Sequence, residues 1–234
     1  MQTSDVAIAT ITWVRDAGEE ALLARALDCL ADAGMPVAVA DRGASATFTT
    51  RLERLPGVRV TVPAEKGLVS QVQAAVELAA SFDRPFVLYT EPDKEYFFAH
   101  RLAGFVRDAP GEPGTGVVLA SRSEDSFQTF PEVQRYTESV INHLCAQLTG
   151  CPGDYSYGPF LMHRALLPQL RQLEPRLGWG WRHATFLAAH RRGLRVVQLT
   201  DDYPCPPDQR HEDDRERTHR LRQLSQNILG LIES

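Results

Sequence analysis

The sequence lacks any apolar run near the roughly 20 residues that a membrane-spanning helix needs, and its first residues lack the basic start of a secretory signal. It also lacks an excess of positive charge, because 25 Lys and Arg face 30 Asp and Glu and the formal net charge is −5. Nucleic-acid binding through phosphates requires a basic footprint that is missing here. We therefore expect a cytoplasmic protein with no integral membrane segment and no nucleic-acid partner.

Cysteine is scarce, and its spacing does not fit a closed zinc site. The cysteines are Cys29, Cys145, Cys151 and Cys205, and no two of them form a Cys-x-x-Cys pair. Cys145 and Cys151 are near enough in sequence to pair, but a reducing compartment disfavours a disulfide. We expect all four thiols to be reduced and structural.

Two common nucleotide-binding motifs are also missing. No segment matches G-x-x-x-x-G-K-[ST], and the first apolar run leads into Trp13-Val14-Arg15-Asp16 instead of G-x-G-x-x-G. Both absences disfavour a P-loop phosphotransferase and a standard dinucleotide-binding dehydrogenase.

The sequence does contain short apolar runs that alternate with helical periodicity, which is typical of a mostly parallel sheet flanked by helices. The expected strands are residues 6–13, 36–40, 57–62, 85–90, 117–120, 157–162 and 194–199. The expected helices lie around residues 21–30, 68–80, 96–108, 133–148, 165–173, 182–191 and 212–232. No repeat or long linker divides the 234 residues, so we predict one Rossmann-like α/β domain over residues 1–234.

Acidic residues follow the fourth expected strand, at the edge where open α/β sheets bind ligands. Glu91 and Asp93 are two positions apart, so an extended backbone puts both carboxylates on the same side. Carboxylates suit Mg²⁺ or Mn²⁺, which need only one or two of them when substrate phosphates supply further oxygens. The alternative is a solvated acidic turn that continues through Lys94 and Glu95.

Several short segments occur in a definite order along the chain. They are Asp41-Arg42-Gly43-Ala44-Ser45, Glu65-Lys66-Gly67-Leu68-Val69-Ser70-Gln71, Glu91-Pro92-Asp93, Ala120-Ser121-Arg122, Gly158-Pro159-Phe160-Leu161-Met162-His163-Arg164 and residues 182–197. This order resembles the GT-A glycosyltransferases, and in layout glycosyltransferase family 2, over nearly the whole chain. In that family the metal motif is Asp-x-Asp, and here Glu91 replaces its first Asp.

The resemblance implies a GT-A-like fold with a mixed, mostly parallel sheet. Residues 1–122 would form the nucleotide-sugar-binding half, and residues 123–234 the acceptor half with a C-terminal helix. The implied activity is the metal-dependent transfer of a sugar from a nucleotide diphosphate sugar to an unidentified small-molecule or glycan acceptor. The implied cofactor is Mg²⁺ or Mn²⁺, which would neutralise the leaving diphosphate.

The resemblance also assigns residues to the donor site. Asp93 would be the main metal ligand and a catalytic residue, and Glu91 would assist it at the metal and the nucleotide. The other nucleotide-binding residues would be Thr10, Thr12, Trp13, Asp41 and Gly67. Without the resemblance, Asp41 reads equally well as a turn aspartate and Trp13 as a core residue.

The segment before the late helix departs from the family. Inverting members usually place an acidic general base there, and residues 177–183 contain no carboxylate. One alternative is that His183 is the base, since an imidazole titrates near neutrality. The other is a retaining enzyme resembling the mannosylglycerate and glucosyl-phosphoglycerate synthases, which implies His211 as a metal ligand. A surface histidine is the competing interpretation of His211.

Two tryptophans in the same segment lie between glycines. Trp179 and Trp181, with Arg182, are expected to contact the sugar or the acceptor, because loops often carry function. The alternative is that the two rings plug the edge of the core.

Two other functions stay open. A nucleotidyltransferase also uses carboxylate-held Mg²⁺, but the segment after its first strand is normally rich in glycine and basic residues, and residues 14–20 hold one glycine. A GT-A-like domain without catalysis, acting in binding or assembly, fits the Glu91 replacement and the missing late carboxylate.

Overall fold

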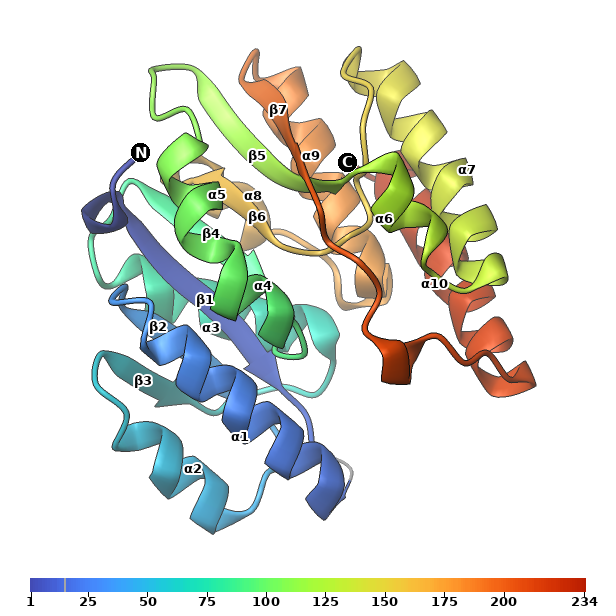
Figure 1. Ribbon diagram of the computed structural model, residues 1–234. Coiled ribbons are helices and arrows are strands. Elements are labelled where there is room, and N and C mark those ends of the chain that lie inside the picture. The colour runs from blue at the N-terminus through green and yellow to red at the C-terminus, as the bar shows by residue number, and fades with distance from the viewer. Residues whose placement is uncertain (15) are drawn as a thin grey trace.

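The computed structural model (Figure 1) describes residues 1–14 and 16–234, without the side chain of Asp208. One sheet holds seven strands in the order β3-β2-β1-β4-β6-β5-β7. In chain order the strands are β1 (Val6–Thr12), β2 (Val37–Asp41), β3 (Val58–Thr61), β4 (Phe86–Thr90), β5 (Thr115–Arg122), β6 (Phe160–His163) and β7 (Arg195–Asp201). Only β6 runs antiparallel to its neighbours, so the prediction of a mixed, mostly parallel sheet is confirmed.

Helices cover both faces of this sheet. Those of eight residues or more are α1 (Ala17–Ala31), α2 (Ala46–Glu53), α3 (Leu68–Ala80), α7 (Glu132–Thr149), α9 (Trp181–Arg191) and α10 (Asp214–Ile232). The shorter ones are α4 (Glu95–His100), α5 (Leu102–Asp108), α6 (Glu124–Gln128), α8 (Leu167–Leu170) and the 3₁₀ turns η1 (Thr3–Asp5), η2 (Arg164–Leu166), η3 (Pro175–Gly180) and η4 (Pro207–Gln209). One apolar core lies under α1, α2, α4 and α5, and the other under α3, α8 and α9 (Figure 1).

The central strands are mostly apolar because both of their faces are covered, and their polar residues lie toward their carboxyl ends. Every residue of β1, β2 and β4 is buried. Strands from both expected halves of the chain belong to this one sheet, since β6 inserts between β4 and β5. Parallel pairing brings the carboxyl ends of β2, β1 and β4 to one edge, in that order.

Local sequence sets the helix boundaries. The side chain of Ser45 caps α2 by accepting a hydrogen bond from the backbone of Phe48, and α3 begins after Gly67, whose φ of 123° favours glycine. The expected helix over residues 96–108 is two helices, α4 and α5, which meet at Arg101.

The apolar stripe expected on the helix around residues 133–148 is only partly buried. Tyr136, Val140 and Leu148 are exposed, whereas Ile141 and Cys145 are buried with the polar Gln134, Thr137 and Glu138. The inner face of α7 therefore carries polar groups, which line the site described below. All four cysteines are free, as expected. Among the described residues, none of the helices combines the length and the hydropathy that a membrane crossing requires.

Two glycines allow α10 to pack against the turn η3. A Cβ atom built on Gly230 would overlap the carbonyl of Gly180, and one built on Gly180 would overlap the backbone of Gln226. The two backbones therefore touch, and this contact fixes the C-terminal helix beside the segment that carries both tryptophans.

We predict that Gly230→Ala lowers the free energy of unfolding by about 1–3 kcal/mol, because the added methyl group overpacks this crossing. The matched control is Gly104→Ala in α5, where the nearest atom to the new Cβ is the end of the Arg107 side chain at 3.6 Å. That change should leave stability unchanged or raise it by up to about 1 kcal/mol. Urea unfolding measures both, and equal effects of the two changes would contradict the close crossing.

Candidate functional site

Polar side chains gather where β1 and β2 end. The hydroxyl of Thr12 donates a hydrogen bond to Oδ1 of Asp41 over 2.6 Å, and both side chains are buried. Gln71 of α3 donates from Nε2 to the carbonyls of Thr12 (2.6 Å) and Ala40 (2.8 Å). Thr10 is fully buried, and its Oγ1 has no hydrogen-bond partner among the described residues. Gln71, which the sequence did not single out as a functional residue, thus ties together the ends of β1 and β2.

Two further predicted nucleotide residues, Trp13 and Gly67, border this edge. Trp13 is 65% exposed, so its interpretation as a core residue is wrong. Gly67 is exposed at the start of α3. Across the same edge, Nη1 of Arg42 donates to the carbonyl of Glu65 over 2.7 Å and ties the ends of β2 and β3 together.

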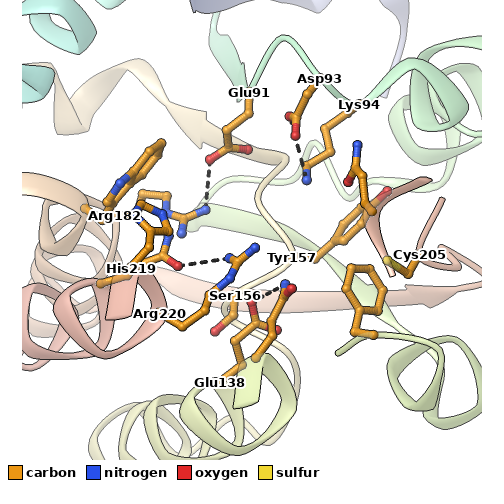
Figure 2. A pocket seen from close by; sticks show the side chains of 15 residues that line it. Glu91, Asp93, Lys94, Glu138, Ser156, Tyr157, Arg182, Cys205, His219 and Arg220 are labelled. Carbon is orange, nitrogen blue, oxygen red and sulfur yellow. Dashed lines mark hydrogen bonds and ion pairs between the residues drawn. The ribbon is translucent and has the colours of Figure 1, made fainter. Parts of the chain in front are cut away.

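A cavity of about 190 Å³ opens beside the end of β4. In Figure 2, Glu91, Asp93 and Lys94 lie on one side of it, and Glu138 and Arg220 on the other. The residues that line it are Glu91, Asp93, Lys94, Phe130, Gln134, Glu138, Ser156, Tyr157, Trp179, Arg182, Cys205, Gln209, His219, Arg220 and Gln223. The cavity therefore draws on both expected halves of the chain.

Glu91 is held by an ion pair across the cavity wall. Nη1 of Arg182 donates to Oε1 of Glu91 over 3.0 Å, and the side chains are only 4% and 13% exposed. A Cβ atom on Gly158 would overlap Oε2 of Glu91, and the φ of Gly158 is 129°. The backbone conformation favours glycine at this position, and the glycine leaves Glu91 in place.

Two other carboxylate oxygens at the cavity are suited to bind a metal ion. Oε2 of Glu91 and Oδ1 of Asp93 are buried, and neither has a hydrogen-bond partner among the described residues. The nearest cation to Asp93 is Lys94, with Nζ 3.8 Å from Oδ1. Unpartnered carboxylate oxygens two positions apart are suitable ligands for Mg²⁺ or Mn²⁺ when a diphosphate completes the coordination.

The structure does not bring the predicted third metal ligand to these carboxylates. His211 is exposed in the connection between η4 and α10 and does not line the cavity. Among the described residues, no three His, Cys, Asp or Glu side chains gather closely enough to hold a metal. A different histidine, His219 in α10, lines the cavity.

Two other predictions in this region are corrected by burial. His183 is 0% exposed, and burial lowers its pKa well below 6.5, with Arg182 adding to the shift. It therefore has no access to a substrate as a general base. Trp181 is also 0% exposed, with its ring centroid 4.7 Å from that of Tyr89 in an edge-to-face arrangement. Both residues are on α9, which is buried in its first two turns, so Trp181 belongs to the core.

Trp179 has a different environment from Trp181. It is half-buried and lines the cavity, and the guanidinium carbon of Arg182 lies 5.4 Å from its ring centroid. Its backbone N–H donates to Oε1 of Gln226 over 3.1 Å, which fixes the turn against α10. Trp179 and Arg182 are thus the members of the predicted acceptor set that reach the cavity.

A buried arginine organises the floor of the cavity. Arg122, at the end of β5, donates from Nε and Nη2 to Asp154 over 2.6 and 3.0 Å, and from Nη2 to Glu138 over 2.6 Å. Its guanidinium also lies over the ring of Phe130 at 4.4 Å. Burial alone would lower the pKa of Arg122, but the two carboxylates raise it above its usual value.

The same network fixes the loop that precedes β6. Asp154 accepts a hydrogen bond from the backbone of Ser156 over 3.0 Å, and its own N–H donates to Oγ of Ser121 over 3.0 Å. This places Ser156 and Tyr157 on the cavity wall and Gly158 against Glu91. The sequence signalled Arg122 through its Ala-Ser-Arg segment, but gave no sign of its two partners.

Comparisons with known proteins identify the fold. No protein-family profile matches the chain, and no curated protein matches it. Among solved structures, the chain is similar to glucosyl-3-phosphoglycerate synthase from Mycobacterium tuberculosis in complex with UDP, with a TM-score of 0.65 and 16% identity over 98% of this chain and 79% of that chain. The complex of that synthase with Mn²⁺, UDP and glucosyl-3-phosphoglycerate gives a TM-score of 0.62 and 18% identity, over 97% and 80%.

A further solved mycobacterial protein gives a TM-score of 0.63 and 17% identity, over 97% of this chain and 75% of that chain. Identities this low show the fold alone. The chain has the mixed sheet of the GT-A glycosyltransferases, and the predicted fold is confirmed.

We predict that Asp154→Asn lowers the free energy of unfolding by about 3 kcal/mol at neutral pH, because it leaves the buried Arg122 with one carboxylate. Burial would raise the pKa of Asp154, but Arg122 outweighs it and holds that pKa below its usual 3.8. A lowered pKa stabilises the fold above the unfolded value, and this contribution is lost as the pH falls through the folded value.

The difference in stability between wild type and Asp154→Asn should therefore shrink below about pH 4. Glu77→Gln is the matched control. Arg171 donates two hydrogen bonds to Glu77 over 2.6 and 3.0 Å, the same lengths as between Arg122 and Asp154, but this pair lies on the surface. This substitution should cost less than about 1 kcal/mol. Urea titrations across pH measure both variants, and a pH-independent loss for Asp154→Asn would contradict the assignment.

Proposed function

We propose that this protein is a metal-dependent glycosyltransferase that uses a nucleotide diphosphate sugar as donor. The observation that carries the proposal is the pair of buried carboxylate oxygens, one each on Glu91 and Asp93, that accept no hydrogen bond from the described residues and lie at a polar cavity. They lie at the ligand-binding edge of a GT-A sheet, and solved neighbours of that fold were determined with Mn²⁺ and UDP or UDP-glucose.

In this proposal the nucleoside binds along the ends of β1 and β2. Asp41 is fixed by Thr12, so its carboxylate is oriented to accept hydrogen bonds from a base. The exposed ring of Trp13 and the backbone at Gly67 border the same edge. Thr10 is 0% exposed, so it lies beneath this edge and supports it without being accessible to the nucleoside.

Asp93 and Glu91 would hold Mg²⁺ or Mn²⁺ between the protein and the diphosphate. When bound, the cation neutralises the charge that develops on the departing nucleotide. Arg182 binds Oε1 of Glu91 and leaves Oε2 available, and Gly158 leaves that oxygen room. Oδ1 of Asp93, two residues away, accepts no hydrogen bond from the described residues. The protein would thus contribute two carboxylates, of which Arg182 holds Glu91, and the donor would contribute the other charged oxygens.

The dimensions of the cavity favour a small, polar acceptor over a glycan chain. Its volume is about 190 Å³. Arg220, His219 and Gln223 of α10 line the side opposite the carboxylates. Solved neighbours carry phosphoglyceric acid or glycerol 3-phosphate, which are compounds of this size class and suitable acceptor probes.

We predict that Asp93→Asn weakens Mn²⁺-dependent binding of UDP at least tenfold and lowers UDP release from UDP-glucose about 100-fold, because one metal-binding carboxylate is lost. The matched control is Asp108→Asn at the end of α5, whose carboxylate pairs with Arg107 at the surface. It should behave as wild type. Calorimetry with UDP, with and without Mn²⁺, measures binding, and UDP release with phosphoglyceric acid present measures turnover.

Wild-type protein that binds no UDP, UDP-glucose or other nucleotide sugar, with either cation, contradicts the proposed function. If Asp93→Asn binds UDP as strongly as wild type in the presence of Mn²⁺, the protein still binds the donor nucleotide, but Asp93 is not the metal ligand. Thermal melts of both variants distinguish a local effect from unfolding.

The two tryptophans provide a second prediction. Trp179→Ala should raise the KM for the acceptor several-fold with little loss of stability, because its ring faces the cavity. Trp181→Ala should instead lower the free energy of unfolding by about 3–5 kcal/mol, because it empties a fully buried site. Steady-state kinetics and urea unfolding on both variants test the contrast, and similar profiles for the two would contradict the different roles.

A further inference from the structure

The sheet has two edges, and they differ in how well they are protected from pairing. Strand β3 is four residues long, and the exposed Arg59 occupies its centre. Strand β7 is seven residues long, and its five central residues, Val-Val-Gln-Leu-Thr, carry no charge. Short edges with central charges resist pairing, whereas long uncharged edges invite it. The edge of β7 is therefore the exposed pairing surface of the sheet.

The backbone of β7 presents hydrogen-bonding groups along this edge. The N–H of Arg195 donates to Gly114 over 2.7 Å, and the carbonyl of Asp201 accepts from Ser123 over 2.9 Å. The odd-numbered residues of β7 thus direct their backbone N–H and C=O groups toward β5. Because successive residues alternate, Val196, Gln198 and Thr200 direct their N–H and C=O groups outward. β7 pairs with no strand other than β5 among the described residues.

The side chains of β7 are complementary to a second copy of themselves. The strand begins with Arg195 and ends with Asp201, and Gln198 lies midway between them. In an antiparallel pair of two β7 strands with its two-fold axis at Gln198, each Arg195 lies opposite the other copy's Asp201. Moving the axis by one residue places Arg195 opposite Leu199, or Asp201 opposite Val197, so charge selects this register.

The same register satisfies the backbone and the apolar side chains. It sets Gln198 opposite Gln198 and Val196 opposite Thr200, so all the outward N–H and C=O groups meet partners. It also sets Val197 opposite Leu199, and both are half-buried side chains that pack on the core at one face. Pairing would cover the apolar area that they still expose.

From these features we propose that this protein forms a two-fold symmetric dimer in which β7 pairs antiparallel with β7 of a second copy. Each charged end already has a partner within its own chain: Arg195 bonds to Glu112 at 2.8 Å, and Asp201 lies 3.5 Å from Arg101. Those ion pairs are exposed and contribute little to the stability of the single chain. Rearranging them so that Arg195 and Asp201 also contact the second copy therefore costs little free energy. The dimer extends the sheet and does not depend on the proposed activity.

The test is sedimentation velocity of the full chain over a concentration series, with a monomer mass of 26.1 kDa. We expect a reversible dimer of twice that mass for the wild type. Thr200→Pro removes one outward N–H without breaking the bonds to β5, as proline is tolerated at strand edges facing solvent. It should yield a monomer with an unchanged far-UV spectrum, whereas Thr200→Val, which keeps the N–H, should still dimerise.

A charge exchange tests the register and does not rely on proline. Arg195→Asp and Asp201→Arg each set like charges opposite one another twice per dimer, and each should weaken association at least tenfold. The double variant exchanges the two charges and should recover most of the affinity. A wild type that stays monomeric, or a dimer that Thr200→Pro leaves intact, would overturn the proposal. Failure of the double variant to recover while remaining folded would overturn the antiparallel register.

Discussion

The buried ion cluster of Arg122, Asp154 and Glu138 is the interaction on which the rest of the site depends. It joins the end of β5, the inner face of α7 and the loop before β6 among buried side chains. Burying three charges is costly unless each is paired and hydrogen-bonded, and here the guanidinium binds both carboxylates while Asn142, Gln134 and backbone amides bind the remaining oxygens. The cluster thus defines a single position for the loop, and with it for Gly158 beside Glu91.

Glu91 connects this cluster to the edge of the sheet where β2, β1 and β4 end. One of its oxygens is bound by Arg182 of α9, and the other is kept free by the lack of a side chain at Gly158. Residues from the second half of the chain therefore orient a carboxylate that follows β4 in the first half. A metal bound there would depend on the correct packing of α9 and of the loop before β6, because each restrains one oxygen of the same side chain.

Much of the fold follows from local sequence, and much of the site does not. The buried runs of β1, β2 and β4 and the span of α3 are predictable because apolar periodicity and a glycine cap mark them. Helix α2 escapes prediction because it is short and has only two buried residues, Phe48 and Leu52. The different environments of Trp179 and Trp181 depend on α10 crossing the turn at Gly180, a contact about 50 residues away that no local pattern encodes. The partners of Arg122 are likewise remote in sequence.

The proposed function depends on whether Glu91 and Asp93 bind a divalent cation together with a nucleotide diphosphate. The most direct measurement is anomalous diffraction at the manganese edge from crystals grown with Mn²⁺ and UDP. We expect one strong anomalous peak between the Asp93 carboxylate and the diphosphate, with the base near Asp41 at the end of β2. Clear UDP density elsewhere on the molecule, or a manganese peak that contacts neither Asp93 nor Glu91, would contradict it.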